Sequence, residues 1–174
     1  MNMKRTNKIK VVIASDQPVV LSGLQKWFDT RERYRVSASA STAELLLSRL
    51  ERAAGELIVM GCTIDSSFEA LAGGENWPVL RRVRRRCPDA PIVMLTSQTD
   101  PSRFRSMHAA GAAAVVSMDD DVRELDRICS RVMSGMTQVM SKSIADLCDG
   151  ARSFDGGAAY RDVRLTVKPF NAAC

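Results

Sequence analysis

Short aliphatic runs, many of them β-branched, alternate with amphipathic segments along most of the chain. Uninterrupted apolar runs of this length are typical of strands that are buried on both faces of a parallel sheet. They predict strands at Ile9–Ala14, Leu57–Met60, Pro91–Ser97 and Ala113–Ser117, and the weaker alternating pattern of Tyr34–Ala40 predicts a further strand. The alternation therefore limits the chain to a small set of layered α/β folds.

The segment after each strand has the apolar spacing of a helix. Pro18 and Pro101 suit the first turn of a helix, and Ser41–Glu44 has the pattern of a capping box. Parallel strands that are joined by helical crossovers place helices on both faces of the sheet. The sequence predicts an α/β fold of flavodoxin type, with a five-stranded parallel sheet in the order 2-1-3-4-5.

Composition excludes several classes of protein. The chain is 45% hydrophobic and 26% charged, which indicates a globular domain, and the net charge of +5 permits but does not require acidic partners. Its five cysteines form no C-x-x-C pair and there is one histidine, so we expect no zinc site and reduced thiols in a cytoplasmic protein. No apolar run reaches transmembrane length, so we expect no membrane partner.

The chain is expected to divide into a short tail at 1–8, the sheet domain at 9–135 and a linker at 136–164. A short helix is expected at Ser141–Ala151 within the linker, and the last residues, 165–174, are too few to form a domain. Gly61–Asn76 has no periodicity and contains Gly73-Gly74, which predicts an irregular segment.

Three phrases resemble response-regulator receiver domains over roughly Lys8 to Gly135. They are VVIASDQPVVLSGL at Val11–Leu24, PIVMLTS at Pro91–Ser97 and AAGAAAVVSM at Ala109–Met118. DQPVVLSGL and the later RLTVK resemble the NarL/LuxR type, and within it the Rcs-type capsule regulators. In that type a linker joins the receiver to a helix-turn-helix module, of which 165–174 resembles the start.

The resemblance implies phosphoryl transfer to an aspartate at the carboxyl edge of the sheet. Receivers place two acidic residues after the first strand to help hold Mg²⁺, and the acceptor aspartate ends the third strand. A hydroxyl ends the fourth strand and a lysine ends the fifth. In this chain the equivalent residues are expected to be Ser15 and Asp16, Met60 at the acceptor position, Thr96 at the hydroxyl position, and Met118 at the lysine position, or Ser117 with a shift of one residue.

This set has lost most of the chemistry that the family uses. A methionine thioether is a poor ligand for Mg²⁺ and cannot accept a phosphoryl group. Without a new dianion, a lysine at Met118 would be a partly buried charge with no partner. We therefore expect neither a bound Mg²⁺ nor another cofactor, and we expect Met60 to contact Met118 in an apolar pocket. Asp16 and Asp65 remain as less favourable sites of modification.

Two other patterns have a functional and a structural interpretation. The arginines of Arg81–Arg86 form either a solvated helix face or a patch for docking or DNA. Cys62 and His108 would be a catalytic pair only if the fold brought them together with an orienting group, and Cys62 alone would be a redox sensor.

Two functions fit the sequence. The first is a phosphorylation-independent receiver of a LuxR-type transcription regulator, which is not an enzyme and acts by dimerising with itself or with a related regulator. DNA binding would then belong to a C-terminal module absent from this chain. The pairing surface would be either the first and fifth helices or the fourth helix with the fifth strand and fifth helix. The second function is a stand-alone adaptor that sequesters a full-length regulator.

Overall fold

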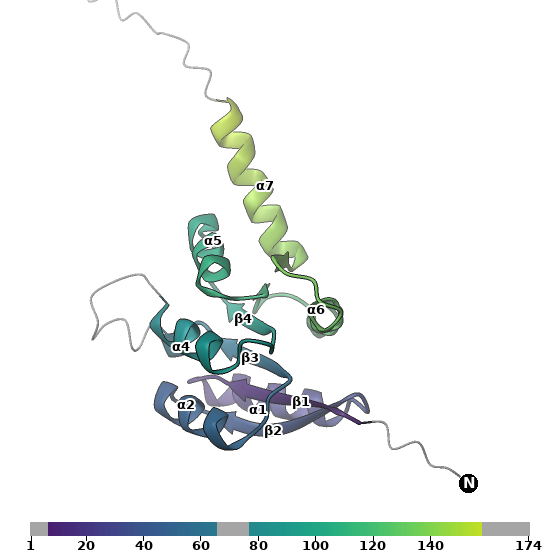
Figure 1. Ribbon diagram of the computed structural model, residues 1–174. Helices are drawn as coiled ribbons and strands as arrows, with labels where there is room; N and C mark the ends of the chain where they lie inside the picture. The colour runs from purple at the N-terminus through teal and green to yellow at the C-terminus, as the bar shows by residue number, and fades with distance from the viewer. Residues whose placement is uncertain (1–6, 66–76, 158–174) are drawn as a thin grey trace, which may run out of the picture.

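A single parallel sheet organises the chain in the computed structural model, which describes residues 7–65 and 77–157 (Figure 1). The strands lie in the order β2-β1-β3-β4-β5-β6. Their bounds are β1 Ile9–Ala14, β2 Tyr34–Ala40, β3 Leu57–Gly61, β4 Ile92–Thr96, β5 Ala114–Ser117 and β6 Val139–Met140. The predicted α/β class, the parallel pairing and the order of the first five strands are confirmed.

The expected number of five strands is wrong, because β6 pairs with β5 at the edge of the sheet. Gly135 and Gln138 take positive φ values of 93° and 54°, and the chain then runs parallel to β5 with Val139 opposite Ala114. A two-residue strand is too short to show periodicity, so β6 could not be predicted from the sequence pattern. β6 and a following helix fall within the segment expected to be a linker at 136–164.

Helices cover both faces of the sheet. Helices α1 and α6 pack on one face, and α2, α4, α5 and α7 pack on the other. The bounds are α1 Pro18–Asp29, α2 Ala43–Arg52, α4 Pro78–Arg86, α5 Pro101–Ala110, α6 Val122–Met133 and α7 Lys142–Gly157. In the ranges 7–65 and 77–157, none of these helices has the length and apolar content needed to cross a bilayer.

Alternate residues of the central strands enter two separate cores. Val12, Ile58 and Met94 face α2, α4 and α5, whereas Val11 and Val93 face α1 and α6. All five side chains have no solvent exposure. Because both faces are buried, side chains can reach solvent together only at the ends of the strands, and this places any shared site at the carboxyl edge.

A buried carboxylate starts helix α4. Asp65 is fully buried, and its two oxygens accept hydrogen bonds from the backbone N–H groups of Val79 (3.0 Å) and Leu80 (2.9 Å). Trp77 precedes the helix in a left-handed conformation (φ 47°) and offers no side-chain cap. Asp65 thus supplies both the acceptors and the negative charge that a helix N-terminus favours.

Replacing this cap should destabilise the domain strongly. Asp65→Ala leaves two buried N–H groups without their acceptors, so we expect the free energy of unfolding to fall by about 2–4 kcal/mol. Urea denaturation followed by circular dichroism measures it. Asp100→Ala is the matched control, since Asp100 caps α5 at an exposed position and its loss should be clearly smaller. Equal losses would contradict the structural role given to Asp65.

Three expectations concern residues outside the described ranges in whole or in part. Most of the tail at 1–8, the greater part of Gly61–Asn76 and all of 165–174 fall there.

Candidate functional site

The residues singled out by the resemblance gather at the carboxyl edge of the sheet. Ser15 and Asp16 follow β1, Thr96 ends β4, and Met118 follows β5. The strands are in register there, with Ala14 opposite Met60 and Thr96 opposite Ser117. The fold therefore brings the ends of β1, β3, β4 and β5 side by side, as the sequence predicted.

Gly61, not Met60, faces the loop that carries Asp16. A Cβ atom built on Gly61 would lie 3.5 Å from Ser15 Oγ and 3.7 Å from Thr63 Oγ1. The side chain of Met60 has no solvent exposure and belongs to the core under α2, α4 and α5. Because successive side chains of a strand point to opposite faces, a shift of one residue moves the edge position into the core.

The expected contact between Met60 and Met118 is wrong for the same reason. Met118 packs against the core under α1 and α6, on the other face of the sheet from Met60. The edge is therefore not closed by a pair of thioethers, and the two methionines have separate surroundings.

The remaining polar groups at the edge bond to one another. The Thr63 hydroxyl donates to Asp16 Oδ1, and Gln17 N–H donates to the buried Ser15 Oγ at 3.2 Å. Thr96 is fully buried, and its hydroxyl oxygen accepts from Gln98 N–H at 3.0 Å. These bonds hold the loops after β1 and β4 close to the ends of their strands.

The donor set at this edge does not fit Mg²⁺. Asp16 supplies a carboxylate, but Ser15 and Gly61 stand where further acidic ligands would be needed, and Asp65 is engaged at α4. Within the part of the chain that the structure describes, no group of three or more His, Cys, Asp or Glu side chains is placed to hold a metal. Hard divalent cations favour several oxygen ligands, so one carboxylate is a weak site.

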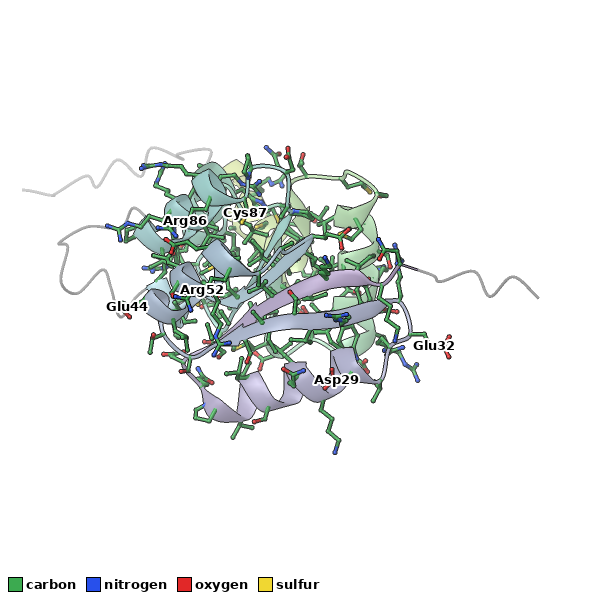
Figure 2. The ribbon with its side chains drawn as sticks, turned by 60° about the horizontal axis from the view of Figure 1, so that its bottom comes forward. Asp29, Glu32, Glu44, Arg52, Arg86 and Cys87 are labelled. Atoms are coloured by element: carbon green, nitrogen blue, oxygen red, sulfur yellow. The ribbon has the colours of Figure 1, made fainter. Side chains whose placement is uncertain are left out.

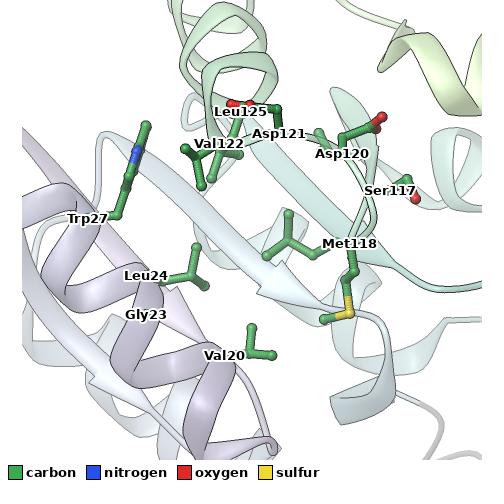
Figure 3. Close-up of a pocket in the computed structure, with 12 residues that line it drawn as sticks. Val20, Gly23, Leu24, Trp27, Ser117, Met118, Asp120, Asp121, Val122 and Leu125 are labelled. Atoms are coloured by element: carbon green, nitrogen blue, oxygen red, sulfur yellow. The ribbon is translucent and has the colours of Figure 1, made fainter.

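Met118 lines an apolar groove between α1 and α6. The groove has a volume of about 240 Å³, and Figure 3 shows Met118 on the same wall as the end of β5, facing Val20 and Leu24 of α1. Leu125 and Trp27 line its other end. Sequence reasoning did not identify this groove, because its lining comes from helices and strands that are far apart in the chain.

The structure separates Cys62 from His108. Cys62 follows β3 at the carboxyl edge and its Sγ donates to Thr96 Oγ1 at 3.4 Å. His108 lies near the end of α5, where Nδ1 is 3.0 Å from the carbonyl oxygen of Ala112, just before β5 begins. Cys62 lies at the carboxyl edge of the sheet and His108 at the opposite edge, so the two residues do not form a catalytic pair.

Among the other cysteines that the structure describes, Cys129 and Cys148 are buried and Cys87 is partly exposed. Burial raises the pKa of the Cys129 thiol to about 12, and it also raises the pKa of Cys87. A thiol with a raised pKa has little thiolate and reacts slowly. None of the four cysteines that the structure describes is in a disulfide.

Comparison of the sequence with known proteins gives regulators of transcription. The chain is 30% identical over 117 residues to the uncharacterized transcriptional regulatory protein YhcZ of Bacillus subtilis, covering 67% of this chain and 51% of that protein. It is 22% identical over 162 residues to the transcriptional regulatory protein RcsB of Escherichia coli, covering 93% of this chain and 71% of that protein. The chain thus spans about half the length of YhcZ. No protein-family model matches it.

Solved structures share the fold. A two-component response regulator of the LuxR family from Aurantimonas sp. SI85-9A1 matches with a TM-score of 0.72 and 22% identity, over 84% of this chain and 99% of that one. The isolated REC domain of RcsB from Salmonella enterica serovar Typhimurium matches with a TM-score of 0.68 and 18% identity, over 81% and 99%. The chain therefore contains a response-regulator receiver domain of the LuxR type.

Proposed function

We propose that this chain is a receiver domain that signals by pairing with another receiver, without phosphorylation. The observation that carries the proposal is the absence of a carboxylate at the end of β3, where Gly61 faces Ser15. Receivers are expected to carry the acceptor aspartate at this place. A glycine cannot accept a phosphoryl group, and a neighbouring serine cannot complete a magnesium site.

The two nearby aspartates do not replace the acceptor. Asp16 is held by the Thr63 hydroxyl, and both oxygens of Asp65 accept from backbone amides in a fully buried position. Phosphoryl transfer depends on a nucleophile with an open line of attack. Thr96 keeps the hydroxyl that would bind a phosphoryl group, so we interpret it as a retained part of the scaffold.

The structure favours one of the two pairing surfaces that the sequence left open. α7 and β6 pack along β5 and α5, with Ile144 fully buried and Cys148 4% exposed in that core. The chain itself therefore occupies much of the surface formed by α5 and β5. A partner would have to displace a helix that is already packed there, which makes this surface the less favourable one.

The surface of α1 and α6 is the better candidate. The groove that contains Met118 opens between these helices, and Val122, which lines it, is 54% exposed. Val19 precedes the lining residue Val20 on α1 and is 85% exposed. Exposed apolar residues around a groove are typical of an interaction site. A second copy of this chain, or a related regulator, would bury both valines in an isologous contact.

By this proposal the chain belongs to a paired regulator that is cytoplasmic and is not an enzyme. Solved structures of RcsB include RcsB dimers bound to DNA, and this chain matches the receiver part of that protein. By this proposal, specific DNA binding belongs to a further module, and this chain supplies the pairing.

Phosphorylation can be tested directly. Incubation of the protein with acetyl phosphate and Mg²⁺, followed by intact-mass analysis, should show no added phosphoryl group, because no acceptor carboxylate faces the edge. A stable mass increase of one phosphoryl group that survives in Ser15→Ala but disappears in Asp16→Asn would contradict the proposal.

Restoring the acidic residues should restore cation binding. We expect Ser15→Asp combined with Gly61→Asp to gain a Mg²⁺-dependent increase in Tm, because the new Cβ at Gly61 has ordinary van der Waals clearance. At a Mg²⁺ concentration of about 100 times Kd the gain would be about 2.7 kcal/mol.

The matched control is Ser15→Asp combined with Met60→Asp. It places a carboxylate in the apolar core, so we expect no Mg²⁺ effect and a loss of about 3 kcal/mol or more in the free energy of unfolding. Magnesium binding by the control but not by the Gly61 variant would show that Met60 is the edge position after all.

Pairing should depend on α1 and α6. Val19→Glu combined with Val122→Glu should weaken self-association by about 100-fold or more, because each copy would bury unpaired carboxylates. Analytical ultracentrifugation measures it, with Leu147→Glu on α7 as the control, since Leu147 is 38% exposed on the other surface.

Each result selects one interpretation. Dissociation by Leu147→Glu alone would move the interface to α7. A wild-type monomer that still binds a full-length LuxR-type regulator would favour the adaptor function.

A further inference from the structure

We infer that helix α1 of a second copy crosses α1 at Gly23 about a two-fold axis, and that this glycine lets the two helices approach closely. The inference rests on the proposed pairing through α1 and α6, and it assigns the central contact of that surface. Gly23 stands inside α1, between Pro18 and Asp29, where glycine is among the least favourable residues for a helix.

Nothing in the described part of the chain requires a glycine at this position. Gly23 is exposed, and a Cβ atom built on it would meet no heavy atom within 4 Å. Its φ is negative, so any residue can adopt the backbone conformation. Figure 2 shows α1 along one side of the molecule, with its outer side turned away from the sheet. A glycine that the single chain does not need indicates the close approach of another backbone.

Gly23 forms a notch in a row of larger side chains. Val19, Gly23 and Trp27 are spaced four residues apart, and rows of this spacing are the ridges by which helices pack. Val19 is exposed, and Trp27 is half-buried and lines the groove together with Gly23. Figure 3 shows Gly23 on α1 between Val20 and Trp27. A second helix can therefore enter the row at this notch.

The row is arranged symmetrically about its notch, which suits a second copy of the same helix. Val19 and Trp27 each lie about 6 Å along the helix axis from Gly23, in opposite directions. A two-fold axis at the crossing places Gly23 of one copy against Gly23 of the other. It also places each Val19 beside Trp27 of the other copy, so one small and one large side chain fill the same layer.

The surface of α1 and α6 is acidic at the carboxyl edge of the sheet. The loop after β5 carries the three carboxylates of Asp119–Asp121 at this edge. Asp120 accepts from the Ser143 hydroxyl, and Asp121 accepts from the Arg123 N–H. Both donors are neutral groups, so these bonds leave the negative charge of the loop in place.

The opposite end of the same surface is basic, which favours the two-fold arrangement. The last turns of α1 and α6 carry Lys26 and Arg131, and the carboxylate there, Asp29, accepts from Gln25. Because α1 runs from the carboxyl edge to the opposite edge, a two-fold axis across its middle brings the basic end of each copy toward the acidic loop of the other. This charge complementarity supports a second copy as the partner.

The test measures self-association of the full chain by analytical ultracentrifugation, and Tm at a concentration where the single chain predominates. Gly23→Ala should raise Tm by about 2–4 °C, because alanine favours the helix. The same variant should weaken self-association about tenfold, because two added methyl groups meet at the axis. Gly23→Leu should weaken it about 100-fold or more. A glycine without a role in pairing would not move the two quantities in opposite directions.

Gly150→Ala is the matched control. Gly150 also lies inside a helix, α7, where it is exposed and a Cβ atom would meet no heavy atom within 4 Å. This variant should raise Tm by a similar amount and leave self-association unchanged.

The orientation of the two helices has a separate test. Lys26→Glu should weaken self-association about fivefold, because it brings a carboxylate toward the acidic loop of the other copy. Lys142→Glu on α7 makes the same change of charge at an exposed position away from α1, and it should have no such effect.

The outcomes distinguish this inference from the pairing proposal. If Val19→Glu with Val122→Glu dissociates the protein while Gly23→Ala and Gly150→Ala associate like the wild type, the pairing surface stands and the crossing at Gly23 is overturned. A wild type that stays monomeric contradicts both. If Gly23→Leu then weakens binding to a full-length LuxR-type regulator, the notch belongs to that partner and not to a second copy.

Discussion

Burial of the sheet on both faces is the constraint from which the other features follow. Strands such as β3 and β4 have no solvent-facing side, so successive residues supply two different cores. Polar chemistry is then confined to the carboxyl edge, and interaction surfaces are confined to the outer sides of the helices. The candidate site and the groove at Met118 occupy places of these two kinds.

Most of the fold follows from local patterns, whereas the register at the edge does not. Continuous apolar runs such as Ile9–Ala14 identify a strand whatever its neighbours are. In the same kind of run, residues that face opposite cores are equally apolar, so hydrophobicity cannot tell which of Met60 and Gly61 faces the site. The structure decides between these two residues, because Ser15, which follows the neighbouring strand β1, lies against Gly61. The role of Asp65 could not be predicted for a similar reason, because its partners Val79 and Leu80 lie 14 and 15 residues further along the chain.

The groove between α1 and α6 was also beyond sequence reasoning. Its apolar lining residues look like ordinary core residues of their own helices and strands, and the sequence around Val19 does not indicate that this residue is exposed. The lengths and packing angles of both helices decide how much of the apolar surface is left uncovered. By contrast, the arginines of α4 could be placed on a helix face from spacing alone, whereas the pairing of Arg86 with Glu51 and the hydrogen bonds from Arg84 to Gly111 required the structure.

The composition of the edge is consistent with a site that has changed as a unit. A carboxylate at Gly61 would need a cation to offset its repulsion from Asp16, and the cation would need a second acidic residue at Ser15. A lysine at Met118 would in turn need the added negative charge. Removing any one of these groups lowers the benefit of the others. The neutral residues Ser15, Gly61 and Met118 therefore fit together, because none of them needs the charge of another.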